Sequence, residues 1–236
     1  MNRPELSIVI PIFNEEESLP VLHDEIEAAL ASLGEVGERA EVIYVNDCST
    51  DGSLAVMRRL QQRDRRVRIV QFRRNFGQTA ALAAGFDESR GGVVVTMDGD
   101  LQNDPADIPM IVAKLEEGFD VVAGWRRRRH DGFILRRLPS LLANRLIGLV
   151  TGVRIHDTGC TLKAFRSAVI KSMVIYAEQH RFLPVLSTGS GARVTEVVVN
   201  HRPRLYGKSK YGLGRAFRVL IDLIVIKFIS QFSQRP

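Results

Sequence analysis

The sequence predicts an α/β protein built on a doubly wound, mostly parallel sheet. Short apolar runs, too short for typical helices, alternate with segments whose apolar residues recur at helical spacing. Strands that alternate with helices in this way form parallel sheets with helices on both faces. The chain has 236 residues, 45% of them hydrophobic, which suits one domain with a sizeable core and argues against a disordered or fibrous chain.

The first predicted strand spans residues 7–13. Asn14 then offers a helix cap, and the glutamates at 15–17 favour a helix N-terminus, after which leucine and isoleucine recur at helical spacing. The second strand spans residues 41–45 and ends at Asn46-Asp47. Ser53 is expected to cap a helix that runs to about Arg63.

The third strand is expected at residues 67–72, before an alanine-rich helix over 78–89. The β-branched run that begins at Val93 is the fourth strand. Pro105 suits the first turn of the following helix, and residues 119–124 form the fifth strand. These elements complete the alternating pattern.

Two carboxylates, Asp98 and Asp100, stand at the end of the fourth strand with Gly99 between them, and Gln102 follows. In extended backbone the two acids project to the same side, and the glycine permits close approach. Hard oxygen ligands of this kind suit Mg²⁺ or Mn²⁺, especially when a bound phosphate supplies further oxygens. An ordinary acidic turn has the same residue types, so the motif alone leaves both interpretations open.

The context of this motif favours a ligand site. Asn14 and Asp47 also follow predicted strands, and ligands bind at the carboxyl ends of parallel strands. Glycine-rich phosphate loops are absent, so side chains and a metal would hold a nucleotide, with Asp47 accepting hydrogen bonds from its base or ribose. No nucleophile elbow or zinc-type cluster is present, and the five scattered histidines are interpreted as structural.

Basic residues gather in two blocks in the second half of a chain whose net charge is +6. The first comprises residues 126–129 with Arg136 and Arg137, and the second spans residues 202–218 without an acidic residue. Such blocks can contact nucleic acid, anionic lipid or phosphate-bearing substrates, although a single run is usually solvated surface. Because no nucleic-acid-binding motif accompanies them, we expect phosphate or membrane contacts and no nucleic-acid partner.

The ends of the chain and its cysteines bear on location. Two cysteines offer no disulfide framework, which suits a reduced cytosolic setting, and no signal peptide is expected before the first strand. Residues 219–230 are apolar but contain Asp222 and Lys227, and they are fewer than the ~20 residues that span a bilayer. We expect an amphipathic interfacial helix there, with a buried core helix as the alternative, and a second candidate at residues 133–150.

Several segments resemble a known family: PIFNE at 11–15, NDCSTDGS at 46–53, NFGQ at 75–78, DGDLQNDP at 98–105 and HRPRLYGKSKY at 201–211. They are similar to the inverting family 2 glycosyltransferases of GT-A fold. More narrowly, they resemble the polyprenyl-phosphate glycosyltransferases, which include dolichol-phosphate mannose synthase and bacterial undecaprenyl-phosphate glucosyltransferases. The resemblance covers about residues 6 to 230. Asn46 stands where the family commonly has a second acid, so the nucleotide contact is assigned to Asp47.

The resemblance implies roles for individual residues. It implies metal ligands at Asp98, Asp100 and Gln102, and catalytic roles for Asp100, Arg126 and Asp157, the last an acid that faces the sugar site. It implies acceptor-phosphate contacts at Arg126 and at Arg136 or Arg137. It implies donor contacts at Pro11, Asn14, Glu15, Asp47, Gln78, Asp98, Arg202 and Lys208.

The implied activity moves a sugar from a nucleoside-diphosphate sugar to a polyprenyl phosphate, undecaprenyl or dolichyl, in cell-envelope chemistry. The cofactor is Mg²⁺ or Mn²⁺, the location is the cytoplasmic face of the cell membrane, and a homo-oligomer is possible. Residues 1–214 would form the catalytic domain, and residues 215–236 a juxtamembrane amphipathic helix that ends before membrane helices. The alternatives are a soluble family 2 transferase acting on a polysaccharide or protein hydroxyl, and a non-catalytic binding module.

Overall fold

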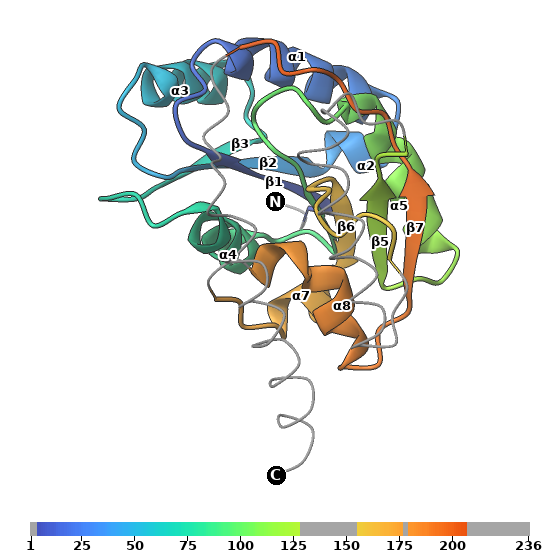
Figure 1. Cartoon of the computed structure of the whole chain (residues 1–236). Helices are drawn as coiled ribbons and strands as arrows, with labels where there is room; N and C mark the ends of the chain where they lie inside the picture. Colours follow the sequence, from blue (N-terminus) through green and yellow to red (C-terminus); the bar gives the residue numbers. More distant parts are fainter. Residues whose placement is uncertain (1–3, 128–154, 177–178, 207–236) are drawn as a thin grey trace.

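The computed structural model describes residues 4–127, 155–176 and 179–206 of the chain. These residues contain one seven-stranded sheet with the strand order β3-β2-β1-β4-β6-β5-β7 (Figure 1). Its strands are β1 (Leu6–Ile12), β2 (Ala40–Asn46), β3 (Val67–Gln71), β4 (Val93–Thr96), β5 (Val121–Trp125), β6 (Lys163–Arg166) and β7 (Val194–Val198).

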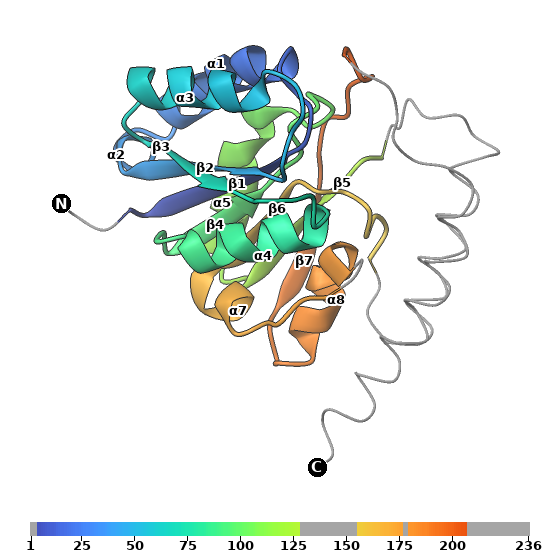
Figure 2. The same cartoon turned by 90° about the vertical axis from the view of Figure 1, so that its left-hand side faces the viewer.

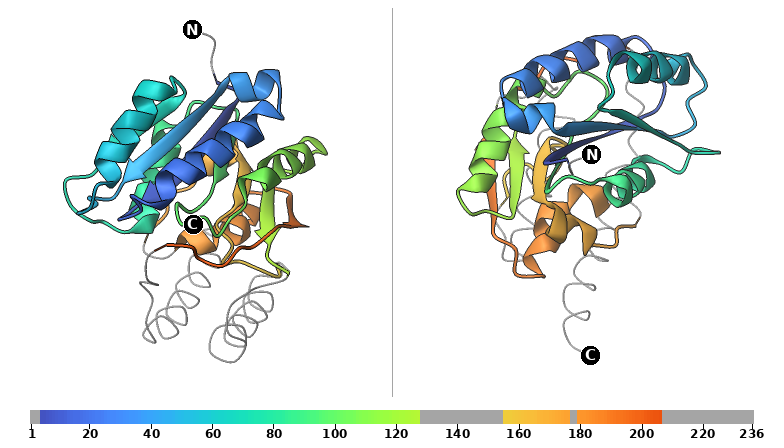
Figure 3. Two further views of the ribbon diagram at one scale, coloured as in Figure 1. Left: turned by 90° about the horizontal axis from the view of Figure 1, so that it is seen from above. Right: turned by 180° about the vertical axis from the view of Figure 1, so that it is seen from behind.

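The sheet is mostly parallel, as predicted. Strands β1 to β4 pair in parallel, and β5 pairs in parallel with β7. Only β6 runs the other way among the strands of the described residues, and it lies between β4 and β5, antiparallel to both. Strands β3 and β7 form the opposite edges of the sheet (Figure 3).

Helices cover both faces of the sheet (Figure 2). Helices α1, α3 and α5 lie on one face, and α4, α7 and α8 lie on the other. The helices are α1 (Ser18–Ala31), α2 (Glu35–Glu38), α3 (Ser53–Arg63), α4 (Gln78–Glu88), α5 (Ile108–Glu116), α7 (Ser167–Lys171) and α8 (Leu183–Thr188), with 3₁₀ turns η1 (Pro105–Asp107) and η3 (Gln179–Arg181).

Strand β1 is buried on both faces, which explains its continuous apolar sequence. Leu6, Ile8 and Ile10 pack with helices α1, α3 and α5, whereas Val9 packs with α4 on the other face. The two apolar cores therefore meet at this strand. Its carboxyl end lies in the middle of the sheet, beside the end of β4, where the candidate site begins.

The structure corrects three details of the predicted boundaries. Asn14 does not cap α1, which begins at Ser18; its backbone is left-handed at φ 56° and its amide oxygen accepts a bond from the Thr50 N–H. Ser53 does not cap α3 with its side chain, because its hydroxyl accepts the Glu15 N–H at 2.8 Å. Pro105 opens η1 rather than an α-helix. The first two corrections share a cause: these polar groups connect the loops after β1 and β2.

Several predictions fall on residues outside the described ranges. They include Arg136, Arg137, Lys208 and the apolar segments 133–150 and 219–230. Among the residues that the structure does describe, no helix has the length and apolar character needed to cross a membrane.

Candidate active site

The acidic motif lies immediately after β4, next to the end of β1. A Cβ on Gly99 would stand 2.6 Å from Ile12 Cδ1 at the end of β1, so a larger residue here would require the Ile12 side chain to shift. Leu101 is fully buried with a left-handed φ of 62°, which turns the chain back after the acids. The Gln102 N–H donates to Asp100 Oδ1 at 3.1 Å and closes that turn.

The two carboxylates form a site that favours a cation. Burial, and after it the negative charge of Asp100, raises the pKa of Asp98 to about 6. The Gln78 amide donates to Asp98 at 2.7 Å, and the Arg204 guanidinium contacts the Asp100 carboxylate. Two neighbouring carboxylates concentrate negative charge, and the Arg204 guanidinium already lies against one of them. The donor set therefore fits Mg²⁺ or Mn²⁺.

The loops that follow β1 and β2 are fastened together beside this motif. The Asn14 N–H donates to the Ser49 hydroxyl at 3.0 Å, and the Glu16 N–H donates to the Asp51 carboxylate at 3.2 Å. Pro11, which precedes these loops in β1, pairs in register with Val45 of β2. The predicted donor residues of the first two strands are thus held together at the carboxyl ends of these strands.

Asp47 is buried, and its carboxylate is used within the protein. It accepts the backbone N–H groups of Phe76 at 2.7 Å and Gly77 at 2.9 Å. Gly77 has a φ of 88° and directly precedes α4, whose first residue is Gln78. Asp47 therefore fixes the turn that aims Gln78 at Asp98.

Arg126 and Asp157 form a two-point ion pair just beyond β5. The guanidinium contacts the two Asp157 oxygens at 2.8 and 3.0 Å, and the Arg126 N–H also bonds this carboxylate. Glu196 accepts the N–H groups of His156 and Asp157 and so orients the acid. Because a guanidinium has five N–H donors, this pairing leaves donors for an anion.

Sequence reasoning missed Lys163, whose side chain is buried in β6 beside the site. Its ammonium donates to the Thr158 carbonyl at 3.3 Å, and burial lowers its pKa to about 8 against the opposing charges of Asp157 and Asp98. Nothing in the sequence marked this lysine, because the strand that carries it was not predicted.

The segment 200–204 lies along the acidic loop. The Arg202 N–H donates to the Gln102 carbonyl at 3.0 Å, and its guanidinium pairs with Asp104 at 2.7 Å and Glu25 at 2.8 Å. A cleft of about 650 Å³ is lined by residues 198–202 together with Asp104 and Arg127. The predicted donor residue Arg202 thus lies near the metal motif but is paired with other acids.

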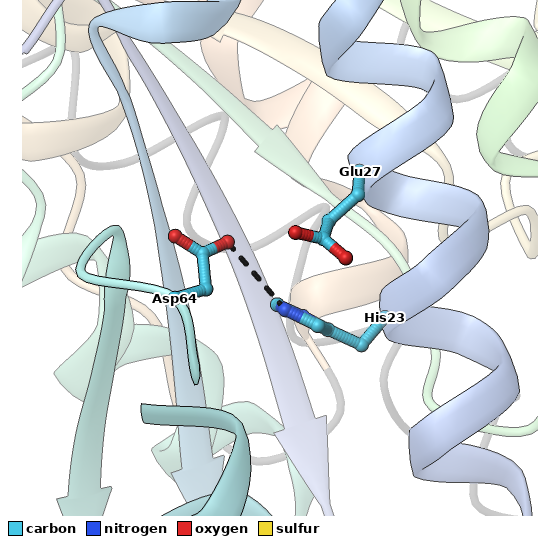
Figure 4. Close-up of side chains that lie close together, drawn as sticks. All are labelled: His23, Glu27 and Asp64. Atoms are coloured by element: carbon cyan, nitrogen blue, oxygen red, sulfur yellow. Dashed lines mark ion pairs between the residues drawn. The ribbon is translucent and has the colours of Figure 1, made fainter. Parts of the chain in front are cut away.

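A second acidic group, His23, Glu27 and Asp64, has ligand atoms within 4.8 Å of one another (Figure 4). Asp64 precedes β3, so this group lies toward the amino ends of the strands and away from Asp98. Arg66 already pairs with Asp64 at 2.9 Å and with Glu27 at 3.3 Å. We therefore assign this cluster to the packing of α1 against α3.

Comparison with known proteins places this geometry in a family. The profile of "Glycosyl transferase family 2" matches residues 7–174. The chain is 47% identical to dodecaprenyl-phosphate galacturonate synthase of Rhizobium johnstonii over 98% of its length and 69% of that protein. It is 41% identical to undecaprenyl-phosphate 4-deoxy-4-formamido-L-arabinose transferase of Pseudomonas paraeruginosa over 93% of its length, which is 64% of that protein.

Solved structures share the fold. Glucosyl-3-phosphoglycerate synthase of Mycobacterium tuberculosis, with Mn²⁺, UDP and phosphoglyceric acid, aligns with a TM-score of 0.72 at 20% identity over 96% of this chain and 78% of that chain. A mannosyltransferase of Pyrobaculum calidifontis, with GDP-mannose and Mn²⁺, aligns with a TM-score of 0.65 at 17% identity over 99% of this chain and 65% of that chain. The expected GT-A-like architecture is confirmed, and the chain belongs to glycosyl transferase family 2, among relatives that are polyprenyl-phosphate glycosyltransferases.

Proposed function

We propose that this chain transfers a sugar from a nucleoside-diphosphate sugar to a polyprenyl phosphate, with inversion at the anomeric carbon. The observation that carries the proposal is that an acidic pair and an arginine lie close together at the carboxyl ends of the central strands. Asp98 and Asp100 form the cation-seeking site, and Arg126 lies close enough for its charge to lower the pKa of Asp98. The metal that binds the donor diphosphate needs the acidic pair, and the phosphate of the acceptor needs the guanidinium.

Asp98, Asp100 and Gln102 would hold Mg²⁺ or Mn²⁺, and the Gln102 N–H also supports the turn after Asp100. The metal supplies Lewis-acid stabilisation of the charge that grows on the leaving diphosphate. The known structures bound to Mn²⁺ with UDP or GDP-mannose support this choice of ion. Among the site residues, we expect the replacement of Asp100 to lower the rate of sugar transfer most.

The donor nucleoside would lie over the joined loops after β1 and β2, against Pro11, Asn14 and Glu15. Asp47 would act through the turn it fixes, in addition to any contact with the nucleoside. Gln78 would orient Asp98 through their 2.7 Å bond. Arg202 and Lys208 would contact the donor phosphates.

The acceptor phosphate would meet Arg126 and at least one of Arg136 and Arg137. Its oxygen forms a bond to the anomeric carbon while the bond from that carbon to the donor diphosphate breaks, and the nucleoside diphosphate leaves. Because a phosphate monoester is already anionic near neutral pH, no strong general base is required. Alignment by a fixed guanidinium is the larger need. Asp157 would hold Arg126 in place rather than remove a proton, since both of its oxygens face that guanidinium.

A lipid acceptor places the reaction at a membrane surface, and we propose the cytoplasmic face of the cell membrane. Residues 1–214 would be the catalytic domain. Residues 215–236 would form an amphipathic helix that presents the basic segment to lipid headgroups. Self-association into a homo-oligomer is compatible with this arrangement.

A soluble family 2 transferase that glycosylates a hydroxyl is the second candidate, because the solved structures with the same fold include enzymes named for soluble acceptors. A hydroxyl acceptor requires a carboxylate base. The ion pair that engages Asp157 disfavours this residue as that base.

Dependence of nucleoside diphosphate release on the acceptor separates the two candidates. With Mn²⁺ and a panel of UDP- and GDP-sugars, we expect release to require undecaprenyl phosphate and to fail with undecaprenol, which lacks the phosphate. EDTA should stop release, and added Mg²⁺ or Mn²⁺ should restore it. Equal rates with the alcohol, or with a soluble polysaccharide, would overturn the lipid-phosphate proposal.

A further inference from the structure

The Arg204 guanidinium contacts one carboxylate of the candidate metal site, that of Asp100. One of its nitrogens contacts Asp100 Oδ2, and the other lies 3.7 Å from Glu15 Oε1. All of these side chains are largely buried, with 21% of Arg204 and 8% of Asp100 exposed to solvent. In such surroundings a charge pair is screened less than at the surface.

The backbone that carries Arg204 is fixed by contacts that do not involve its guanidinium. Asn200 donates its backbone and side-chain N–H groups to Asp107 at 2.7 and 3.0 Å. His201 forms a β-bridge with Asn103, and the Arg202 N–H bonds the Gln102 carbonyl. The segment therefore keeps its place along the acidic loop whether or not Arg204 contacts Asp100.

The Gln102 N–H already bonds Asp100 Oδ1 and Arg204 contacts Oδ2, so a divalent cation bound by Asp98 and Asp100 would share the Asp100 carboxylate with the guanidinium. Two cations that share one carboxylate repel each other, so the guanidinium and the metal oppose each other's binding. A nucleoside diphosphate changes this balance, because its negative charges can offset the repulsion.

We propose that Arg204 is a positioning residue that exchanges with the catalytic metal on Asp100. It weakens the binding of the metal alone and makes metal binding depend on the nucleoside diphosphate. This inference rests on the proposed function, because it takes Asp98 and Asp100 as the metal ligands. By reciprocity, the metal must strengthen nucleotide binding by the same factor.

Titration of Mn²⁺, with the free ion measured by electron paramagnetic resonance, tests the exchange without turnover. We expect Arg204→Met to bind Mn²⁺ alone about tenfold more tightly than the unchanged chain does. Arg204→Lys keeps the positive charge, so its Mn²⁺ affinity should be close to that of the unchanged chain. With saturating UDP or GDP the difference between the chains should shrink. Arg166→Met is the matched control, since it removes a guanidinium paired with Glu116 on the surface.

Asp100→Asn distinguishes the two levels of the argument. If it binds Mn²⁺ as the unchanged chain does, the metal site of the proposed function is wrong. If it loses Mn²⁺ while Arg204→Met shows unchanged or weaker Mn²⁺ affinity, the metal site stands and the exchange is overturned. Circular dichroism and melting temperature check that each variant is folded.

Discussion

Asp47 fixes the turn before α4 through two hydrogen bonds, so the replacement of this single side chain should weaken nucleotide binding. In Asp47→Asn one of the two acceptor oxygens becomes an NH₂ group, so either the Phe76 or the Gly77 N–H loses its partner. We expect about a tenfold weaker calorimetric Kd for the nucleoside diphosphate in the presence of metal. The control is Asp87→Asn, on the exposed side of α4. An unchanged Kd in a folded Asp47→Asn would contradict this role.

His23 makes stability depend on pH. It is fully buried, and its Nδ1 lies 3.0 Å from the Tyr44 hydroxyl. Its Nε2 lies 3.5 Å from Asp64 (Figure 4). Burial lowers the pKa of His23, and the charges of Glu27 and Asp64 oppose this only in part. The unfolded chain therefore binds a proton more readily than the folded one below about pH 6.5. The stability that neutral His23 contributes above that pH is lost as the pH falls toward the pKa of His23 in the folded protein.

Urea unfolding at about pH 7.5 and about pH 5.5 measures this loss. We expect the free energy of unfolding to fall more for the unchanged chain than for His23→Gln. His156→Gln, which alters an exposed histidine, should follow the unchanged chain. A parallel fall in His23→Gln would mean that other groups cause the pH dependence.

The contrast between Asp98 and Arg204 shows what the sequence can and cannot predict about single residues. Asp98 and Asp100 were identifiable as candidates because Asn14 and Asp47 also follow predicted strands, and ligands bind at the carboxyl ends of parallel strands. Arg204 reaches Asp100 across a separation of 104 residues, and no local pattern encodes such a contact. The roles of the predicted donor and acceptor residues stay predictions.

At the scale of elements, α4 depends on Gly85 for its close approach to the sheet. A Cβ there would stand 2.2 Å from Val9 Cγ1 of β1 and 3.3 Å from Val45 of β2. We expect Gly85→Ala to lower the free energy of unfolding by about 1–3 kcal/mol, despite alanine's higher helix propensity. The displaced helix would also loosen the bond between Gln78 and Asp98.

Gly92→Ala is the comparison for this substitution, because its Cβ would meet nothing closer than Glu5 O at 3.7 Å. It should leave the free energy of unfolding nearly unchanged. If Gly85→Ala proves as stable as Gly92→Ala, the packing of α4 is looser than the structure indicates. Denaturant unfolding of the two variants side by side decides this.

The elements of the first half were predictable because short apolar runs alternate there with segments of helical spacing. The last two strands, β6 and β7, were not. Strand β6 is only four residues long, from Lys163 to Arg166, and has a lysine and an arginine at its ends. Its pairing with β4 and β5 is set by the tertiary fold rather than by its own sequence.

At the scale of the whole molecule, the seven-stranded sheet gathers charges of both signs near the carboxyl ends of its parallel strands. The acids follow β4, while Arg126 follows β5 and Arg204 arrives from beyond β7. The net charge of +6 suits a protein whose two proposed substrates are both phosphates. The order of the sheet, more than any single motif, brings these groups together.

Mass spectrometry of the lipid product tests the proposed transfer most directly. The chain would be incubated with Mn²⁺, undecaprenyl phosphate and each of a panel of UDP- and GDP-sugars, with Asp100→Asn as the inactive control. We expect one or a few donors to yield undecaprenyl phosphate carrying a single sugar, and the control to yield none. If every donor leaves the lipid phosphate unmodified while a soluble hydroxyl acceptor gains the sugar, the chain is a different family 2 transferase.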